Sequence, residues 1–217
     1  MRKRYNTIVT YFALQLFGIL IITTSLAGCN HPITMEESAR IDTLTHYLEE
    51  GDIVFRKGEG LVSRAVVSND IGGKYSHIGM VVRDGDSLKI AHAVPGEPDY
   101  ENDFDRVKCD AISTFFSQKY AVNGAITRLP LTQEQKSILS REALQKVKQK
   151  TKFDHNYNLN DTTKLYCTEF IQLIYSKVGI DICEGRRSSL IIPGIRDELI
   201  MPSDMYDNSC LKTIYYY

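Results

Sequence analysis

A short polar turn between two apolar segments constrains the fold of this chain more than any other feature of its sequence. Residues 76–82 and 87–93 are rich in apolar and β-branched side chains, and the dipeptide Asp84-Gly85 lies between them. Asp-Gly is a preferred dipeptide in two-residue β-hairpin loops. The sequence therefore predicts two antiparallel strands that are joined by a loop formed by these two residues.

This predicted hairpin brings two histidines together. If residues 84 and 85 form the loop, His77 lies directly opposite His92. Directly opposed side chains project from the same face of a sheet, with Cβ atoms ~5 Å apart. A four-residue loop gives the same pairing, whereas a three-residue loop would send His92 to the other face. The loop chemistry thus predicts two neighbouring imidazoles.

Helical and extended segments around the hairpin indicate the α+β class. Strands cluster in the middle of the chain, and helices precede and follow them, which favours a mostly antiparallel sheet. The expected helices cover residues 35–48, 61–67, 111–119, 132–150 and 165–178. The expected strands cover residues 53–55, 76–82, 87–93, 120–129 and 211–217.

The last predicted helix carries a cysteine at the start of an apolar stripe. Side chains of this stripe recur at helical spacing at positions 167, 170, 171, 174 and 178. Cys167 falls in the first turn, where the partial positive charge of the helix N-terminus favours a thiolate. If the stripe packs on the sheet that carries His77, a nucleophile–base pair results, and His92 is placed to orient the base.

Spacing alone leaves other interpretations of these residues open. A cysteine on an apolar helix face is usually an inert core residue. A histidine on a strand is more often structural than catalytic, and two facing histidines with a cysteine can also bind zinc. Packing, catalysis and a metal site are therefore all compatible with the pattern.

Several short motifs in a specific order resemble the permuted papain-like hydrolases of the NlpC superfamily, in the YiiX/YebB-like group. His77 precedes Cys167, as in the permuted group, whereas the cysteine comes first in unpermuted cell-wall peptidases. The resemblance covers residues 49–217. The motifs are Gly51-Asp52-Ile53-Val54-Phe55-Arg56, Tyr75-Ser76-His77-Ile78-Gly79-Met80-Val81, Ala91-His92-Ala93, Tyr166-Cys167-Thr168-Glu169-Phe170-Ile171 and Met201-Pro202-Ser203-Asp204-Met205.

The resemblance implies a circularly permuted papain-like fold, in which the helix bearing the nucleophile packs on a central, mostly antiparallel sheet. It implies Cys167 as nucleophile, His77 as base and His92 as the polar third member. Many relatives carry glutamate at the third place. A histidine there lacks a fixed negative charge, which predicts a weaker or more pH-sensitive thiolate–imidazolium pair.

Three further residues are candidates for the substrate groove or for support of the site. Tyr75, Tyr166 and Glu169 lie within the motifs, although packing or helix capping explains each of them at least as well. The backbone N–H of Cys167 is the expected oxyanion donor. We predict neither a cofactor nor a metal ligand set.

The implied reaction is hydrolysis of an amide through an acyl-cysteine intermediate. The substrates that the resemblance suggests are a cell-wall peptide, an amino-acid amide or an N-acyl compound. One alternative is a lipid acyltransferase or thioesterase of the lecithin:retinol acyltransferase-like type, which also uses His, His and Cys in this order. Another is a non-catalytic domain that binds wall fragments. The formal net charge of −1 shows no basic surface for nucleic acid, and the expected state is a monomer.

The N-terminus predicts export and a lipid anchor. Arg2, Lys3 and Arg4 precede an apolar segment that ends in Leu26-Ala27-Gly28-Cys29, which resembles a bacterial lipobox. We predict a signal peptide over 1–28, then the lipid-bearing Cys29, a tether and a helix over 29–48, and the hydrolase domain over 49–217. The domain would lie in the periplasm or at the cell surface, attached to a bacterial membrane. An uncleaved anchor helix is the alternative.

Overall fold

The computed structural model describes residues 34–189 and 198–217. The predicted signal peptide, 1–28, and the predicted lipid acceptor Cys29 lie outside the described residues, so their assignment stays a prediction. Within the described part of the chain, no helix combines the length and the apolar character that crossing a bilayer requires.

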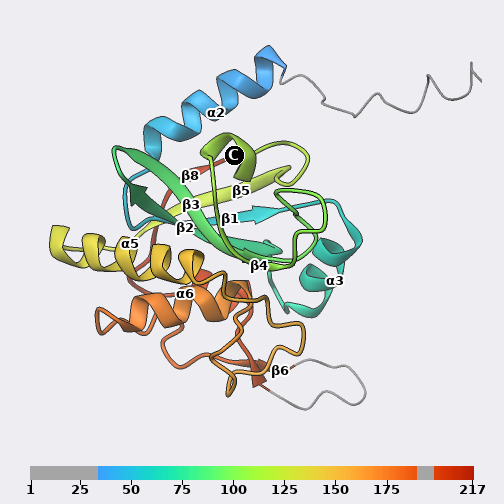
Figure 1. The fold of residues 1–217 in the computed structure, drawn as a ribbon, viewed down its shortest axis with the longest axis vertical. Helices are drawn as coiled ribbons and strands as arrows, with labels where there is room; N and C mark the ends of the chain where they lie inside the picture. Colours follow the sequence, from blue (N-terminus) through green and yellow to red (C-terminus); the bar gives the residue numbers. More distant parts are fainter. Residues whose placement is uncertain (1–33, 190–197) are drawn as a thin grey trace, which may run out of the picture. The chain divides into compact units, whose positions relative to one another are not determined.

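A six-stranded sheet forms the centre of the described chain (Figure 1). Every ladder in it is antiparallel, as predicted. Its strands, in spatial order, are β4 (Arg106–Asp110), β3 (Ser87–Val94), β2 (His77–Asp84), β1 (Ile53–Lys57), β5 (Asn123–Arg128) and β8 (Lys212–Tyr216). A separate two-stranded sheet consists of β6 (Ser188–Ser189) and β7 (Glu198–Leu199). The edge strand β4 was not predicted from the sequence.

Most helices lie close to the positions that the sequence predicts, but the helix at residues 112–115 is shorter than the expected 111–119, and a short helix at residues 202–206 was not predicted. Those in the described residues are α2 (Met35–Tyr47), α3 (Leu61–Asn69), α4 (Ile112–Phe115), α5 (Gln133–Lys148), α6 (Cys167–Ser176) and α7 (Pro202–Tyr206). The Thr132 side chain accepts a hydrogen bond from the Gln135 backbone N–H at 3.2 Å and so caps α5. Gly179 follows α6 with φ +75°, a conformation that favours glycine.

Two hydrophobic clusters cover the two faces of the sheet. The helices α5 and α6 pack on the face that includes Ile78, whereas α2 and α4 contribute to the opposite cluster, which includes Val81 (Figure 1). Successive side chains of a strand alternate between faces. His77 therefore shares the face of Val81, and both His77 and His92 contact Phe115 of α4 there.

The β2–β3 hairpin differs from the predicted register by two residues. Asp84 pairs with Ser87, so the two-residue loop begins at Gly85. Gly85 adopts φ +61°, the conformation that the first loop position of a type II′ turn requires. His77 therefore lies diagonal to His92, and the prediction of direct opposition was wrong. Because a slip of two residues preserves the face, the two imidazoles still project from the same side.

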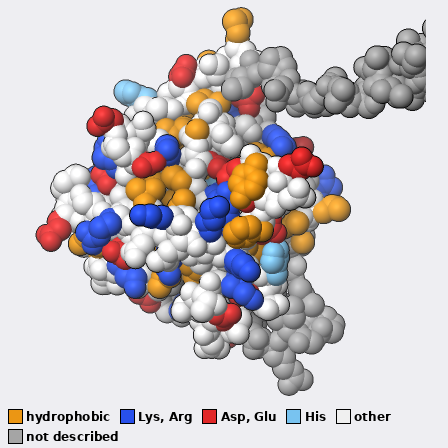
Figure 2. Space-filling view, viewed as in Figure 1, with side chains coloured by type: hydrophobic (Ala, Val, Ile, Leu, Met, Phe, Trp, Pro, Cys, Tyr) orange, Lys and Arg blue, Asp and Glu red, His pale blue; other side chains and the backbone are white. Residues whose placement is uncertain are grey.

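Charged side chains of both signs are spread over the surface. The formal net charge is −1. On the face seen in Figure 2, basic and acidic side chains are interspersed with hydrophobic ones. Long-range electrostatic steering by this face is therefore weak.

Candidate active site

Two buried imidazoles are hydrogen-bonded to each other across the hairpin. His77 Nε2 lies 2.8 Å from His92 Nδ1, and the two rings meet edge to face at 72°. Burial lowers the pKa of both imidazoles, and the positive charge of Arg56 lowers the pKa of His77 further. Both rings are therefore neutral at pH 7, and His77 is in the form that a general base needs.

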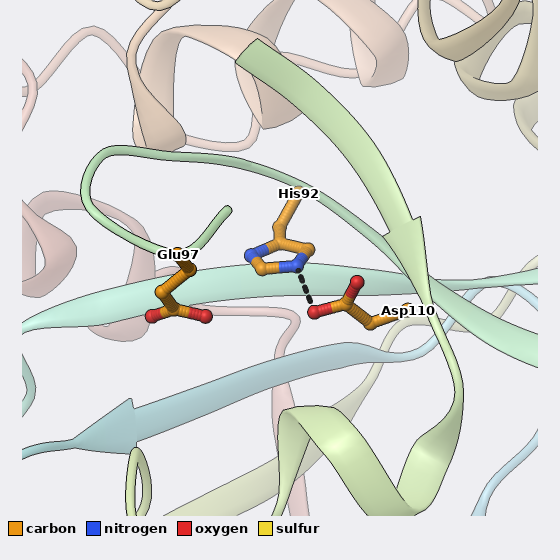
Figure 3. Close-up of side chains that lie close together, drawn as sticks. All are labelled: His92, Glu97 and Asp110. Atoms are coloured by element: carbon orange, nitrogen blue, oxygen red, sulfur yellow. Dashed lines mark hydrogen bonds and ion pairs between the residues drawn. The ribbon is translucent and has the colours of Figure 1, made fainter. Parts of the chain in front are cut away.

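A carboxylate continues this hydrogen-bonded chain. Asp110 Oδ2 lies 3.0 Å from His92 Nε2 (Figure 3), and Asp110 Oδ1 lies 3.1 Å from Lys108 Nζ. Burial acts to raise the pKa of Asp110, but the hydrogen bonds and charges of His92 and Lys108 outweigh it and lower that pKa. The chain His77–His92–Asp110 thus ends on an ionised carboxylate that is only 5% exposed.

Cys167 is the first residue of α6, in the first turn as predicted. Burial raises the pKa of its thiol to about 11, although the backbone N–H groups of Thr168, of Cys167 itself and of Ile78 act to lower it. The helix N-terminus therefore favours the thiolate as expected, but burial is the stronger effect. The thiol of Cys167 and the imidazoles of His77 and His92 are therefore all neutral at pH 7.

The helix α6 and the two histidines belong to opposite faces of the sheet, and they meet at its end. The β2–β3 ladder ends at Met80 and Ala91, and beyond it the backbone N–H of Ile78 approaches the sulfur of Cys167. Cys167 and His77 line one cavity of about 460 Å³. Among the described residues they are not hydrogen-bonded to each other; catalytic hydrogen bonds often tighten only when substrate binds.

Two cavities meet at Cys167, under the helix α3. The larger one is lined by apolar side chains together with charged ones, among them Arg56, Glu97 and Lys119. The smaller one, of about 230 Å³, is mainly apolar. Its lining consists of Val62, Ala65, Val66, Asn69, Tyr157, Tyr166, Cys167, Thr168, Leu199, Ile200, Met201 and Pro202. Since Cys167 lines both, a molecule bound at the sulfur has a space with charged side chains on one side and a space lined by uncharged side chains on the other.

The other predicted site residues lie in different places. Tyr166 lines the apolar cavity, and its hydroxyl accepts a hydrogen bond from the backbone N–H of Ile200 at 2.9 Å. Glu169 lines neither cavity; it accepts the backbone N–H of Tyr166 at 3.4 Å, and burial raises its pKa to about 8. Tyr75 also lines neither of them and packs 5.4 Å from Phe55 between ring centroids.

Sequence reasoning missed Glu97 and Asp110, which belong together with His92. One ligand atom from each of these three residues lies within 4.8 Å of the others, and Glu97 Oε2 is buried without a hydrogen-bond partner among the described residues (Figure 3). This composition suits a metal ion. However, Arg56 pairs with Glu97, Lys108 pairs with Asp110, and both nitrogens of His92 are engaged. Two cations already balance the two carboxylates, so these residues do not fit a divalent cation.

Comparisons with known proteins agree with this fold. Residues 47–215 match the model of a family described as permuted papain-like amidase enzymes, YaeF/YiiX, C92 family. No curated protein matches the chain. The crystal structure of the metalloprotein yiiX from Escherichia coli O157:H7 is similar, with a TM-score of 0.64 and 17% sequence identity. The similarity covers 78% of this chain and 97% of that one, and it supports the fold.

Proposed function

Because the chain belongs to the permuted papain-like amidases of the YaeF/YiiX family C92, we propose that Cys167 attacks the amide carbon of its substrate. In this proposal His77 is the base and His92 orients it. The observation that carries the proposal is that Cys167 lines the same cavity as His77, whose other side is hydrogen-bonded to His92 at 2.8 Å. This is the nucleophile–base–orienter arrangement of cysteine and serine hydrolases.

The neutral resting state sets the order of proton transfers. As the sulfur of Cys167 bonds to the carbonyl carbon, its proton passes to His77 and the carbonyl π electrons move to oxygen. Collapse of this intermediate breaks the C–N bond, His77 returns the proton to the leaving amine, and a thioester remains on Cys167. Water that His77 deprotonates then releases the acid. The backbone N–H groups at the start of α6, which have no carbonyl partner within the helix, are the available oxyanion donors.

The two cavities favour an N-acyl compound among the substrates that the sequence suggests. The apolar cavity would take the acyl chain, where each buried methylene contributes about 0.8 kcal/mol. The larger cavity, whose lining includes the charged side chains of Arg56, Glu97 and Lys119, would take the amine portion.

The experiment that tests this proposal uses N-acyl amino-acid amides with one fixed amine and acyl chains of increasing length. We expect kcat/KM to rise with chain length in the purified protein and to vanish in Cys167→Ala. Ala65 lines only the apolar cavity, so Ala65→Phe should reduce kcat/KM for long chains more than for short ones. Ser68→Phe, on the same helix but lining neither cavity, is the matched control. Equal turnover by Cys167→Ala would refute the nucleophile.

Acyl transfer is the second candidate function, and the same apolar cavity supports it. Transfer and hydrolysis share the thioester on Cys167 and differ only in whether water or another nucleophile removes the acyl group. Mass analysis of products with and without an added alcohol or amine acceptor separates them. If the protein binds wall fragments but consumes no amide or ester, the non-catalytic alternative is correct.

We further propose that the protein is exported and attached to a bacterial membrane by lipid on Cys29. The support is the order of basic start, apolar segment and lipobox in the sequence. A domain held at a membrane would meet acyl-bearing substrates at high local concentration. This placement suits an enzyme that acts on N-acyl compounds.

A further inference from the structure

We propose that Asp110 is a remote positioning residue, whose carboxylate fixes the protons on both imidazoles so that His77 Nδ1 is left as the base for Cys167. The inference rests on the proposed function only in taking Cys167 as the nucleophile. It is carried by the two hydrogen bonds that join His77 to His92 at 2.8 Å and His92 to Asp110 at 3.0 Å.

The proton positions follow from the acceptor at the end of the chain. An ionised carboxylate only accepts, so His92 Nε2 must donate to Asp110. A neutral imidazole carries one N–H, so His92 Nδ1 is bare and accepts from His77 Nε2. His77 then has its own single proton on Nε2. Its Nδ1 is the only ring nitrogen left to receive the thiol proton of Cys167.

The opposite arrangement would disable the site. If His92 carried its proton on Nδ1, it would donate to His77 Nε2, and the proton of neutral His77 would have to sit on Nδ1. The ring nitrogen available to Cys167 would then be a donor and could not act as a base. The hydrogen bond to Asp110 thus sets the tautomer of His92. His92 in turn sets the tautomer of His77, the ring that faces the nucleophile.

The surroundings hold the carboxylate in its ionised form. Lys108 Nζ lies 3.1 Å from Asp110 Oδ1 and is only 4% exposed. The same ammonium donates to Asp99 at 2.7 Å and to the backbone carbonyl of Glu97 at 3.0 Å. Lys108 is therefore fixed by three acceptors and cannot easily turn away from Asp110.

Charged groups from other elements also face the imidazoles. The Arg56 guanidinium from β1 acts to lower the pKa of both rings, whereas the Glu97 carboxylate from the loop after β3 acts to raise the pKa of His92. These two groups are paired with each other, so their effects on the rings partly cancel. Asp110 is the carboxylate that is hydrogen-bonded to the chain of rings, which singles it out as the group that selects the tautomer.

Nitrogen-15 NMR of labelled histidines tests this inference, because it distinguishes protonated from bare ring nitrogens without any substrate. In the purified protein we expect His77 and His92 to be neutral with the proton on Nε2. Asp110→Asn offers a donor as well as an acceptor, and we expect it to populate the Nδ1–H form of His92. Asp110→Glu should retain the wild-type pattern. Asp99→Asn is the matched control, because it changes the same type of side chain on the far side of Lys108.

Kinetics provide a readout that a merely structural role would not change. We expect Asp110→Asn to lower kcat by roughly 10- to 1,000-fold, less than the ~10⁴-fold loss when a carboxylate directly bonded to the base is replaced. KM should change little, and the acid limb of kcat/KM should move to lower pH, because the imidazolium of His77 loses a stabilising negative charge. Asp110→Glu should recover most of kcat.

The outcomes separate the two proposals. An Nδ1–H tautomer of His92 in the wild type, or unchanged tautomers and kcat in Asp110→Asn, would overturn the role of Asp110. If the tautomers are as expected but no variant, including the wild type, cleaves any amide, the proposed function fails while the positioning of the protons stands.

Discussion

Glu169 should make the stability of this protein decrease as pH rises, and Glu169→Gln should remove that decrease. Its side chain is 6% exposed, and burial, with smaller contributions from Asp154 and Asp161, raises its pKa from 4.5 to about 8. The folded state therefore holds a proton that the unfolded state releases above pH 4.5. The stabilisation is complete below pH 4.5 and is lost as pH rises toward 8, at up to ~1.4 kcal/mol per pH unit.

Over that range the loss amounts to roughly 2–5 kcal/mol, with the upper figure applying if no relaxation occurs around the ionised carboxylate. Glutamine keeps the oxygen that accepts the Tyr166 N–H but carries no charge. Urea unfolding can be followed by far-ultraviolet circular dichroism, since the chain has no Trp for fluorescence. The free energies of unfolding of wild type and Glu169→Gln should be equal near pH 4.5. At pH 8.5 the variant should be the more stable. Glu134→Gln, exposed in the first turn of α5, is the control. Parallel curves for wild type and Glu169→Gln would refute the reasoning.

Three further predictions concern the nucleophile, the apolar cavity and the anchor. The rate of Cys167 alkylation by iodoacetamide should rise with pH toward about 11, with exposed Cys210 as internal reference; a plateau at neutral pH in peptide mass spectra would instead indicate a resting thiolate. Tyr166→Phe should cost ~1–3 kcal/mol in urea unfolding, because it leaves the buried N–H of Ile200 without its acceptor; an unchanged midpoint would show that this bond is replaced. Cys29→Ser should abolish the incorporation of labelled fatty acid into the protein, and unaltered labelling would contradict the lipid anchor.

Local sequence signals predicted most of the elements that position the site, because their ends are set by nearby residues. Thr132 and Gly179 fixed two helix ends through capping chemistry. The hairpin register was predicted less well, since glycine, and not aspartate, takes the left-handed position at the start of the loop. The prediction that His77 and His92 project from the same face of the sheet is still correct, because the error in the register was two residues, an even number.

The strand β4 and the role of Asp110 beside His92 were harder to predict from the sequence than the helices. Residues 106–110 alternate charged and apolar side chains, which is a strand pattern, but such a strand usually turns its charged face to water. Here that face is buried, because Lys108 and Asp110 pair with each other and Arg106 with Asp103. These pairings form in the tertiary structure, and Asp110 meets His92 only through the β3–β4 ladder. An alternating charged pentapeptide near a candidate histidine is the signal that was available.

Asp110 supplies the negative charge that His92 lacks. His92 stands where many relatives carry a glutamate, so the sequence predicted that this charge would be missing. The carboxylate is retained, but one imidazole further from His77. With an effective dielectric constant of ~20, the attraction between unit charges falls from roughly 5 kcal/mol at ~3 Å to roughly 2 kcal/mol at ~8 Å. The imidazolium of His77 therefore receives less stabilisation than from a directly bonded carboxylate, while the tautomer is controlled equally well. Burial keeps the imidazole of His77 and the thiol of Cys167 neutral. In the proposed mechanism their charges therefore separate only when Cys167 attacks the substrate.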